Sequence, residues 1–134
     1  MYKILLIEEN TILRTGIKAL FNVHPKFQLF ASANSIGEAV RINPLGTVDL
    51  IITDVSSNPL QVAQDMEAIQ SSFPEDRILI FTWASKKESA LAALDANAAS
   101  YLLKDASGEE LLEVLAQLVE GKNDSKATVV PTGA

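Results

Sequence analysis

The stretch Val48-Asp49-Leu50-Ile51-Ile52-Thr53-Asp54 is a short apolar run that ends in a carboxylate. Its length and its β-branched residues are typical of a strand that is buried on both faces of a parallel sheet. Because an unpaired carboxylate inside such a strand would be strongly unfavourable, we expect Asp54 to lie at the strand's carboxyl end. Open α/β sheets place their ligand sites at that edge. Asp54 is therefore either a structural cap or a working group.

The composition is that of a single compact domain. The chain has 134 residues, of which 48% are hydrophobic and 21% charged, which is enough for one domain with one core. Its net charge of −6 argues against direct binding of nucleic acid, because phosphate backbones would be repelled. The absence of cysteine excludes disulfides, thiolate catalysis and cysteine-based zinc sites. Without a signal segment or an apolar run of membrane length, we expect a cytoplasmic protein with no membrane partner.

Strand-like and helix-like stretches alternate along the chain. Apolar runs predict strands over 3–7, 27–33, 48–53, 78–82 and 101–104, and helical spacing predicts helices over 11–23, 35–44, 60–73, 86–96 and 107–121. This alternation predicts a doubly wound α/β fold, in which five helices cover both faces of a five-stranded parallel sheet. The first and third strands are the most apolar and should be central neighbours, which gives the flavodoxin-like order 2-1-3-4-5. We expect residues 1–121 to form this domain and 122–134 to be a tail or linker.

Several local signals refine this outline. Ser35 with Glu38, and Ser107 with Glu110, have the spacing of helix capping boxes. Asn97 suits a left-handed position just after a helix. We expect the charged stretch 86–88 (Lys-Lys-Glu) to be a solvent-exposed face.

Polar side chains gather at the predicted carboxyl edge of the sheet. Glu8 and Glu9 follow the first strand, next to Asp54 at the end of the third. Three carboxylates in one crevice repel each other unless a cation is present, and Mg²⁺ suits oxygen ligands best. Thr82 and Lys104 end the fourth and fifth strands at the same edge, where a hydroxyl and an ammonium group would hold an anion. This combination points to phosphoryl transfer onto Asp54.

The same residues carry a family resemblance. Over residues 2–121 the chain resembles the receiver domain of two-component response regulators, on the stretches 7–10 (Ile-Glu-Glu-Asn), 49–54, 81–82 (Phe-Thr) and 101–107 (Tyr-Leu-Leu-Lys-Asp-Ala-Ser). The stretches 13–17 (Leu-Arg-Thr-Gly-Ile) and 101–107 are most similar to NarL/FixJ-type receivers. The resemblance implies a phosphoacceptor switch that is not an enzyme in the usual sense, catalysing at most its own phosphorylation and dephosphorylation.

The resemblance also implies residue roles. Asp54 would be the phosphoacceptor, phosphorylated by a histidine kinase, and Lys104 would contact the phosphoryl group. Thr82 and Tyr101 would be the switch hydroxyl and the switch aromatic residue. The metal ligands for Mg²⁺ would be Glu8, Glu9, Asp54 and the backbone carbonyl of Ser56.

The resemblance further implies how the signal would leave the domain. Similar NarL/FixJ-type proteins carry a helix-turn-helix DNA-binding domain after the linker. Control of transcription would then run through an effector domain that is absent from this chain, and a homodimer is compatible with the pattern.

Two other interpretations stay open. A receiver fold kept as a protein-interaction module, without phosphoryl chemistry, is favoured by three departures from the family pattern. Both acidic residues are glutamate where the family usually has an aspartate, Asn58 stands at a common proline position, and Trp83 is a bulky neighbour of Thr82. A mononucleotide-binding domain is disfavoured, because a phosphate loop should be rich in Gly, Ser or Thr, whereas Glu8 and Glu9 stand there.

Overall fold

The computed structural model describes residues 1–42, 48–74 and 76–121. In chain order the elements are β1 (Tyr2–Ile7), α1 (Thr11–Asn22), β2 (Phe27–Ala33), α2 (Ile36–Ile42), β3 (Leu50–Thr53), α3 (Pro59–Ser72), β4 (Arg77–Thr82), the 3₁₀ turn η2 (Ala84–Lys86), α4 (Lys87–Asp95), β5 (Ser100–Leu103) and α5 (Gly108–Glu120). The predicted alternation of strands and helices is confirmed. The predicted helix end at Pro44 and the tail over 122–134 lie outside the described residues.

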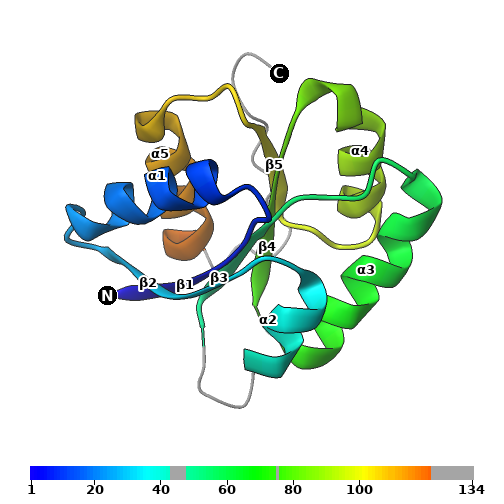
Figure 1. Cartoon of the computed structure of the whole chain (residues 1–134), viewed down its shortest axis with the longest axis horizontal. Helices are drawn as coiled ribbons and strands as arrows, with labels where there is room; N and C mark the ends of the chain where they lie inside the picture. Colours follow the sequence, from blue (N-terminus) through cyan, green and yellow to red (C-terminus); the bar gives the residue numbers. More distant parts are fainter. Residues whose placement is uncertain (43–47, 75, 122–134) are drawn as a thin grey trace.

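The sheet has the predicted topology. Its strands run in the order β2-β1-β3-β4-β5, and every pair of neighbours is parallel. Helices α1 and α5 cover one face, and α2, α3 and α4 cover the other (Figure 1). In the register of β1 and β3, Ile7 lies opposite Thr53, so Glu8 and Asp54 leave the sheet side by side. The carboxyl ends of the two central strands therefore meet at the switch point of the sheet.

Successive residues of a strand point to opposite faces of the sheet and contribute to two hydrophobic clusters, one on each face. Ile51 belongs to the cluster under α2, α3 and α4, together with Met66 and Ala90. Its neighbour Ile52 belongs to the cluster under α1 and α5, together with Phe21. The central strands are apolar on both sides because both sides are covered.

The helix ends follow their sequence signals closely. Ser107 forms a complete capping box with Glu110 at the start of α5. At α2 only half of the box forms as predicted, because Ser35 Oγ accepts the N–H of Glu38 while the Glu38 carboxylate accepts the N–H of Asn34. Asn97 has φ 77° and takes the predicted left-handed position after α4.

Most element boundaries differ from the prediction by one or two residues, and two of these differences have local reasons. The third strand begins at Leu50 instead of Val48, because the Asp49 carboxylate accepts the N–H of Lys3 at 2.7 Å. The fourth helix begins one residue later than predicted, after a 3₁₀ turn that ends at Lys86. In the described part of the chain, no helix has the length and hydropathy required to span a membrane.

Candidate phosphoryl site

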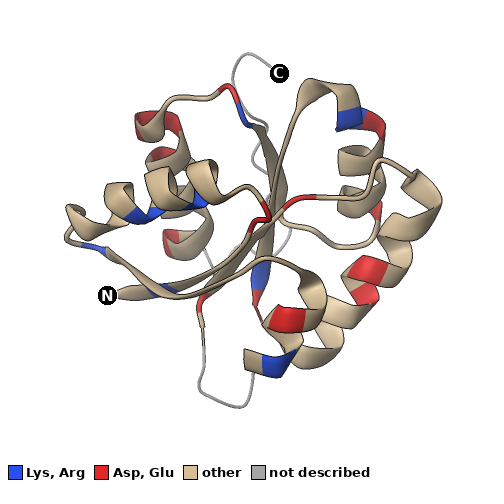
Figure 2. Ribbon diagram, viewed as in Figure 1, with Lys and Arg blue, Asp and Glu red and all other residues tan. Residues whose placement is uncertain are grey.

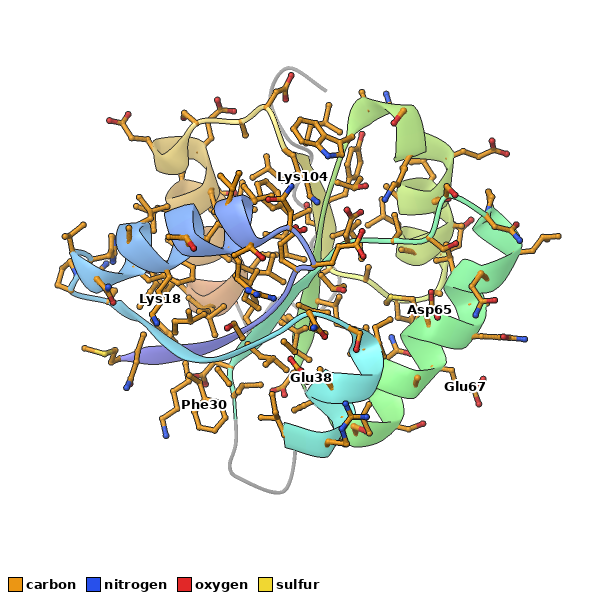
Figure 3. All side chains as sticks on the ribbon, in the orientation of Figure 1. Lys18, Phe30, Glu38, Asp65, Glu67 and Lys104 are labelled. Atoms are coloured by element: carbon orange, nitrogen blue, oxygen red, sulfur yellow. The ribbon has the colours of Figure 1, made fainter. Side chains whose placement is uncertain are left out.

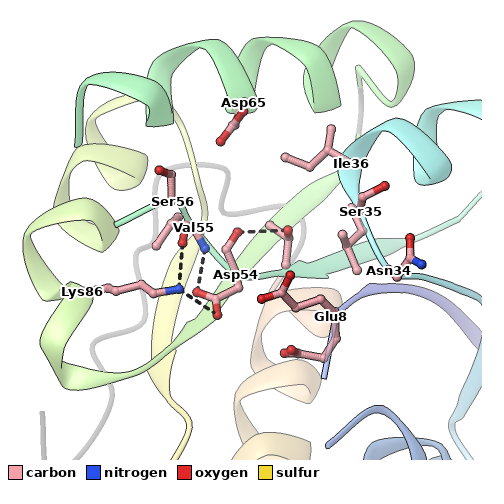
Figure 4. Close-up of a pocket in the computed structure, with 12 residues that line it drawn as sticks. Glu8, Asn34, Ser35, Ile36, Asp54, Val55, Ser56, Asp65 and Lys86 are labelled. Atoms are coloured by element: carbon pink, nitrogen blue, oxygen red, sulfur yellow. Dashed lines mark hydrogen bonds and ion pairs between the residues drawn. The ribbon is translucent and has the colours of Figure 1, made fainter. Parts of the chain in front are cut away.

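Asp54 lies where the chain leaves β3, at the centre of the sheet's carboxyl edge. Its side chain is 22% exposed, so an incoming molecule can reach it. One carboxylate oxygen, Oδ1, accepts the Val55 N–H at 2.7 Å, and the other, Oδ2, accepts a hydrogen bond from Lys104 Nζ at 2.7 Å. The carboxylate opens onto a crevice of about 320 Å³, which Figure 4 shows between Glu8, Ser56 and Lys86. Asp54 is therefore an accessible group and not a buried cap.

Lys104 links the ends of three strands. It follows β5, and its side chain is only 4% exposed. Besides its bond to Asp54, its Nζ lies 2.8 Å from Oε1 of Glu8, whose side chain is 3% exposed. Figure 3 shows Lys104 in the middle of the molecule, in contrast to Glu67, which points outward from α3. A buried ammonium group thus bridges two carboxylates that directly follow β1 and β3, and Figure 2 shows the acidic stretches meeting where these strands end.

The protonation of this pair follows from its contacts. Burial alone would raise the pKa of Asp54, but the hydrogen bond from Lys104, the nearby Thr82 hydroxyl, the Val55 N–H and the Lys104 charge outweigh burial and lower the pKa. Burial would likewise lower the pKa of Lys104, but its hydrogen bonds and charge interactions with Asp54 and Glu8 raise the pKa instead. Both groups are therefore charged at neutral pH.

Lys86 is a site residue that the sequence analysis missed. The expectation of a solvent-exposed face holds for Lys87 and Glu88 and is wrong for Lys86, whose side chain is 28% exposed. Its Nζ lies 3.4 Å from Asp54 Oδ2 and 3.1 Å from the carbonyl oxygen of Val55. The available signal was its position, because it begins the predicted helix over 86–96, which follows a strand that ends at the same sheet edge.

The predicted metal ligands share one crevice, but their side chains do not converge. Glu8, Glu9, Asp54 and Ser56 all line it, and oxygen donors are the type that Mg²⁺ prefers, so the residues fit a divalent cation by chemistry. Glu8 is turned toward Lys104, however, and its Oε2 accepts the N–H of Asn10 at 3.1 Å. Across residues 1–42, 48–74 and 76–121, no three acidic or histidine side chains form a group that could hold a metal ion. In this structure the Asp54 carboxylate contacts two ammonium groups, and the Glu8 carboxylate contacts one of them.

The predicted switch residues lie in the adjoining core. Thr82 is fully buried, and among the described side chains its Oγ1 is the buried oxygen that lacks a hydrogen-bond partner. Tyr101 is 6% exposed and packs in the cluster under α2, α3 and α4. Trp83, by contrast, is 51% exposed, and the Lys104 ammonium lies 5.9 Å from the centre of its ring. The tryptophan therefore borders the site without filling it.

This arrangement suits transfer of an anionic group to a carboxylate. Asp54 supplies a nucleophile that solvent reaches, and Lys104 and Lys86 place positive charge beside it. A buried hydroxyl without a partner, on Thr82, lies close by. Charges fixed before the reaction are the main means by which proteins stabilise a developing phosphoryl transition state.

Comparison with known proteins gives a consistent result. A family model described as the response regulator receiver domain matches residues 4–116. The nitrate/nitrite response regulator homolog of Haemophilus influenzae is 30% identical over 120 residues, which cover 90% of this chain and 58% of that protein. NarL of Escherichia coli K12 is 29% identical over 119 residues, with coverage of 89% and 55%.

A solved structure shows the same relationship. The crystal structure of a LuxR-family two-component response regulator from Aurantimonas superposes with a TM-score of 0.77 at 27% identity, covering 90% of this chain and 86% of that one. The chain spans little more than half the length of the two curated relatives. It belongs to the response regulator receiver family of two-component systems, among NarL-type relatives.

Proposed function

We propose that this chain is a phosphoacceptor switch, in which Asp54 takes a phosphoryl group from a histidine kinase in a Mg²⁺-dependent reaction. The observation that supports it best is the position of Asp54. Its partly exposed carboxylate lies at the end of the central strand, 2.7 Å from the ammonium group of a nearly buried lysine. A lysine in this position is held ready for an anion, since it has no freedom to turn toward solvent.

The proposed step is a simple displacement. A carboxylate oxygen of Asp54 attacks the phosphorus of a phosphohistidine, a P–O bond forms, the P–N bond breaks, and the leaving imidazole takes up a proton from water. Lys104 stabilises the charge on the transferred oxygens, and the free hydroxyl of Thr82 donates to one of them. Bound at Glu8, Glu9, Asp54 and the Ser56 carbonyl, Mg²⁺ would neutralise further phosphoryl charge.

The output of the switch is proposed from the family. Thr82 and Tyr101 would couple the phosphoryl group to the surface formed by α4, β5 and α5, by shifting a pre-existing equilibrium. In a NarL-type protein this surface would control a DNA-binding effector domain and the formation of a homodimer. A cytoplasmic location follows from the same proposal, because the kinase would deliver its phosphoryl group there.

The test uses a small phosphodonor, so that the kinase is not required. The chain is incubated with acetyl phosphate and Mg²⁺, and intact-mass spectrometry detects the addition of one phosphoryl group. Asp54→Asn should remain unlabelled, whereas Asp65→Asn, at another acidic residue of the crevice, should be labelled like the unmodified chain. Labelling of Asp54→Asn, or no labelling of the unmodified chain at saturating Mg²⁺, would refute the proposal.

A second candidate function is a protein-interaction module without phosphoryl chemistry. It is favoured by the contact of Glu8 with Lys104 at 2.8 Å, since this ion pair occupies both a proposed metal ligand and the proposed phosphate-binding lysine. Such a module would bind its partner equally well with and without the phosphodonor. The labelling experiment separates the two functions.

A further inference from the structure

Lys86 reaches the acceptor carboxylate from a different element than Lys104. It ends the turn η2, and its ammonium group extends to Asp54 Oδ2 and to the carbonyl oxygen of Val55 (Figure 4). Both partners are oxygen atoms on the wall of the crevice that also contains Glu8 and Ser56. Lys86 therefore places a positive charge within the same crevice as the oxygen donors proposed for the metal.

The two lysines are held with unequal strength. Lys104 is 4% exposed and makes two ion pairs shorter than 3 Å. Lys86 is 28% exposed, lies 3.4 Å from Asp54 and has a flexible four-carbon stem whose end can return to solvent. Of the two cations beside Asp54, Lys86 is therefore the one that another cation can displace.

We propose that Lys86 is a tethered cation that competes with a divalent metal ion for the Asp54 side of the crevice, and so sets the site's affinity for that ion. The inference rests on the proposed Mg²⁺ dependence of the site. Its physical basis is the repulsion between an ammonium group and a metal ion that both bind beside the Asp54 carboxylate. Removing the charge of Lys86 should raise the affinity for Mg²⁺ about fivefold at low salt, and less at high salt.

The experiment measures binding of Mg²⁺ alone. Amide resonances around Val55 are followed by NMR during a Mg²⁺ titration of the unmodified chain and of Lys86→Met, Lys86→Arg and Lys87→Met. Lys87 is the matched control, because it is the next residue, has the same charge and is exposed. Circular dichroism verifies that each variant is folded.

The inference requires tighter Mg²⁺ binding in Lys86→Met, affinity close to that of the unmodified chain in Lys86→Arg, and a change below twofold in Lys87→Met. Binding that appears only in Lys86→Met would support it most strongly. Equal affinities for Lys86→Met and Lys87→Met, or no binding by any variant, would overturn it. Failure of the proposed function gives a different result. Acetyl phosphate would then not label Asp54 at saturating Mg²⁺, whereas Lys86→Met would still bind Mg²⁺ more tightly than the unmodified chain. That result would refute the phosphoacceptor role and support the competition between Lys86 and the metal ion.

Discussion

Replacing Lys104 by methionine should destabilise the fold, apart from any effect on chemistry. The substitution keeps the length of the side chain and removes the cation that lies 2.8 Å from Glu8 and 2.7 Å from Asp54. The two carboxylates then face each other without the ammonium group between them. Because Glu8 is 3% exposed, water cannot take the place of that group.

The size of the effect follows from the burial of each partner. Removing one member of a buried ion pair costs about 3–5 kcal/mol, because an unpaired charge remains. Glu8 meets this description, whereas Asp54 is 22% exposed and keeps its contacts with Lys86 and the Val55 N–H. We therefore take the low end of the range and expect a loss of about 3 kcal/mol in the free energy of unfolding. For a domain of this size, that loss lowers Tm by about 10 °C.

Urea unfolding followed by circular dichroism measures this loss, with the exposed Lys87→Met as the control for removal of a surface charge. A double-mutant cycle with Glu8→Gln separates the ion pair from lost packing, because the amide carries no charge. The cycle should give a coupling energy of at least about 1.5 kcal/mol between residues 8 and 104. A loss below about 1 kcal/mol in Lys104→Met, or a coupling energy near zero, would refute the buried-pair reasoning.

Two further predictions concern stability. The pKa of Asp54 is lowered by its partners, so its ionised form stabilises the fold above the unfolded pKa, and this contribution is lost as the pH falls through the folded pKa. The difference in urea midpoint between the unmodified chain and Asp54→Asn should therefore be constant near neutral pH and shrink below about pH 4, and a difference that widens in acid would contradict the sign of the shift. Ser107→Ala removes the acceptor for the Glu110 N–H and should cost about 1 kcal/mol, whereas Ser71→Ala, at an exposed position in α3, should be neutral or slightly stabilising; equal urea midpoints for these two variants would count against the cap.

The fold could be predicted from the sequence because its main signal is repeated in β1, β3 and β4 and is present in weaker form in the edge strand β2. A residue such as Ile51 packs under α2, α3 and α4, and Ile52 packs on the opposite face, so a strand that is apolar at both positions must be covered on both sides. Once five strands alternate with helices, right-handed crossovers leave few possible arrangements of the sheet. The position of Asp54 at the carboxyl edge then follows from the strand that precedes it.

The pairing of charges within the site could not be predicted in the same way. The sequence places Glu8, Asp54 and Lys104 at strand ends on the same edge of the sheet, but it does not say which direction a long side chain takes. Glu8 turns inward to Lys104, and Lys86 turns back over Asp54. Each choice depends on distances between residues that are far apart in the chain, and a difference of a few ångströms decides whether a carboxylate faces a lysine or an open crevice.

The resulting balance of charge suggests when the site should need a metal ion. In the resting structure the carboxylates of Glu8 and Asp54 are matched by the ammonium groups of Lys86 and Lys104. A phosphoryl group carries a charge of about −1.5 to −2 at neutral pH, compared with −1 for the carboxylate that it modifies. Phosphorylation therefore adds negative charge to a crevice that also contains Glu9 and Asp65, and a divalent cation becomes more favourable there. We therefore expect Mg²⁺ to bind more tightly in the presence of a phosphoryl mimic such as beryllium fluoride than in its absence. Lys86 would accordingly oppose binding of the metal ion most in the resting state, where the crevice carries less negative charge than after phosphorylation.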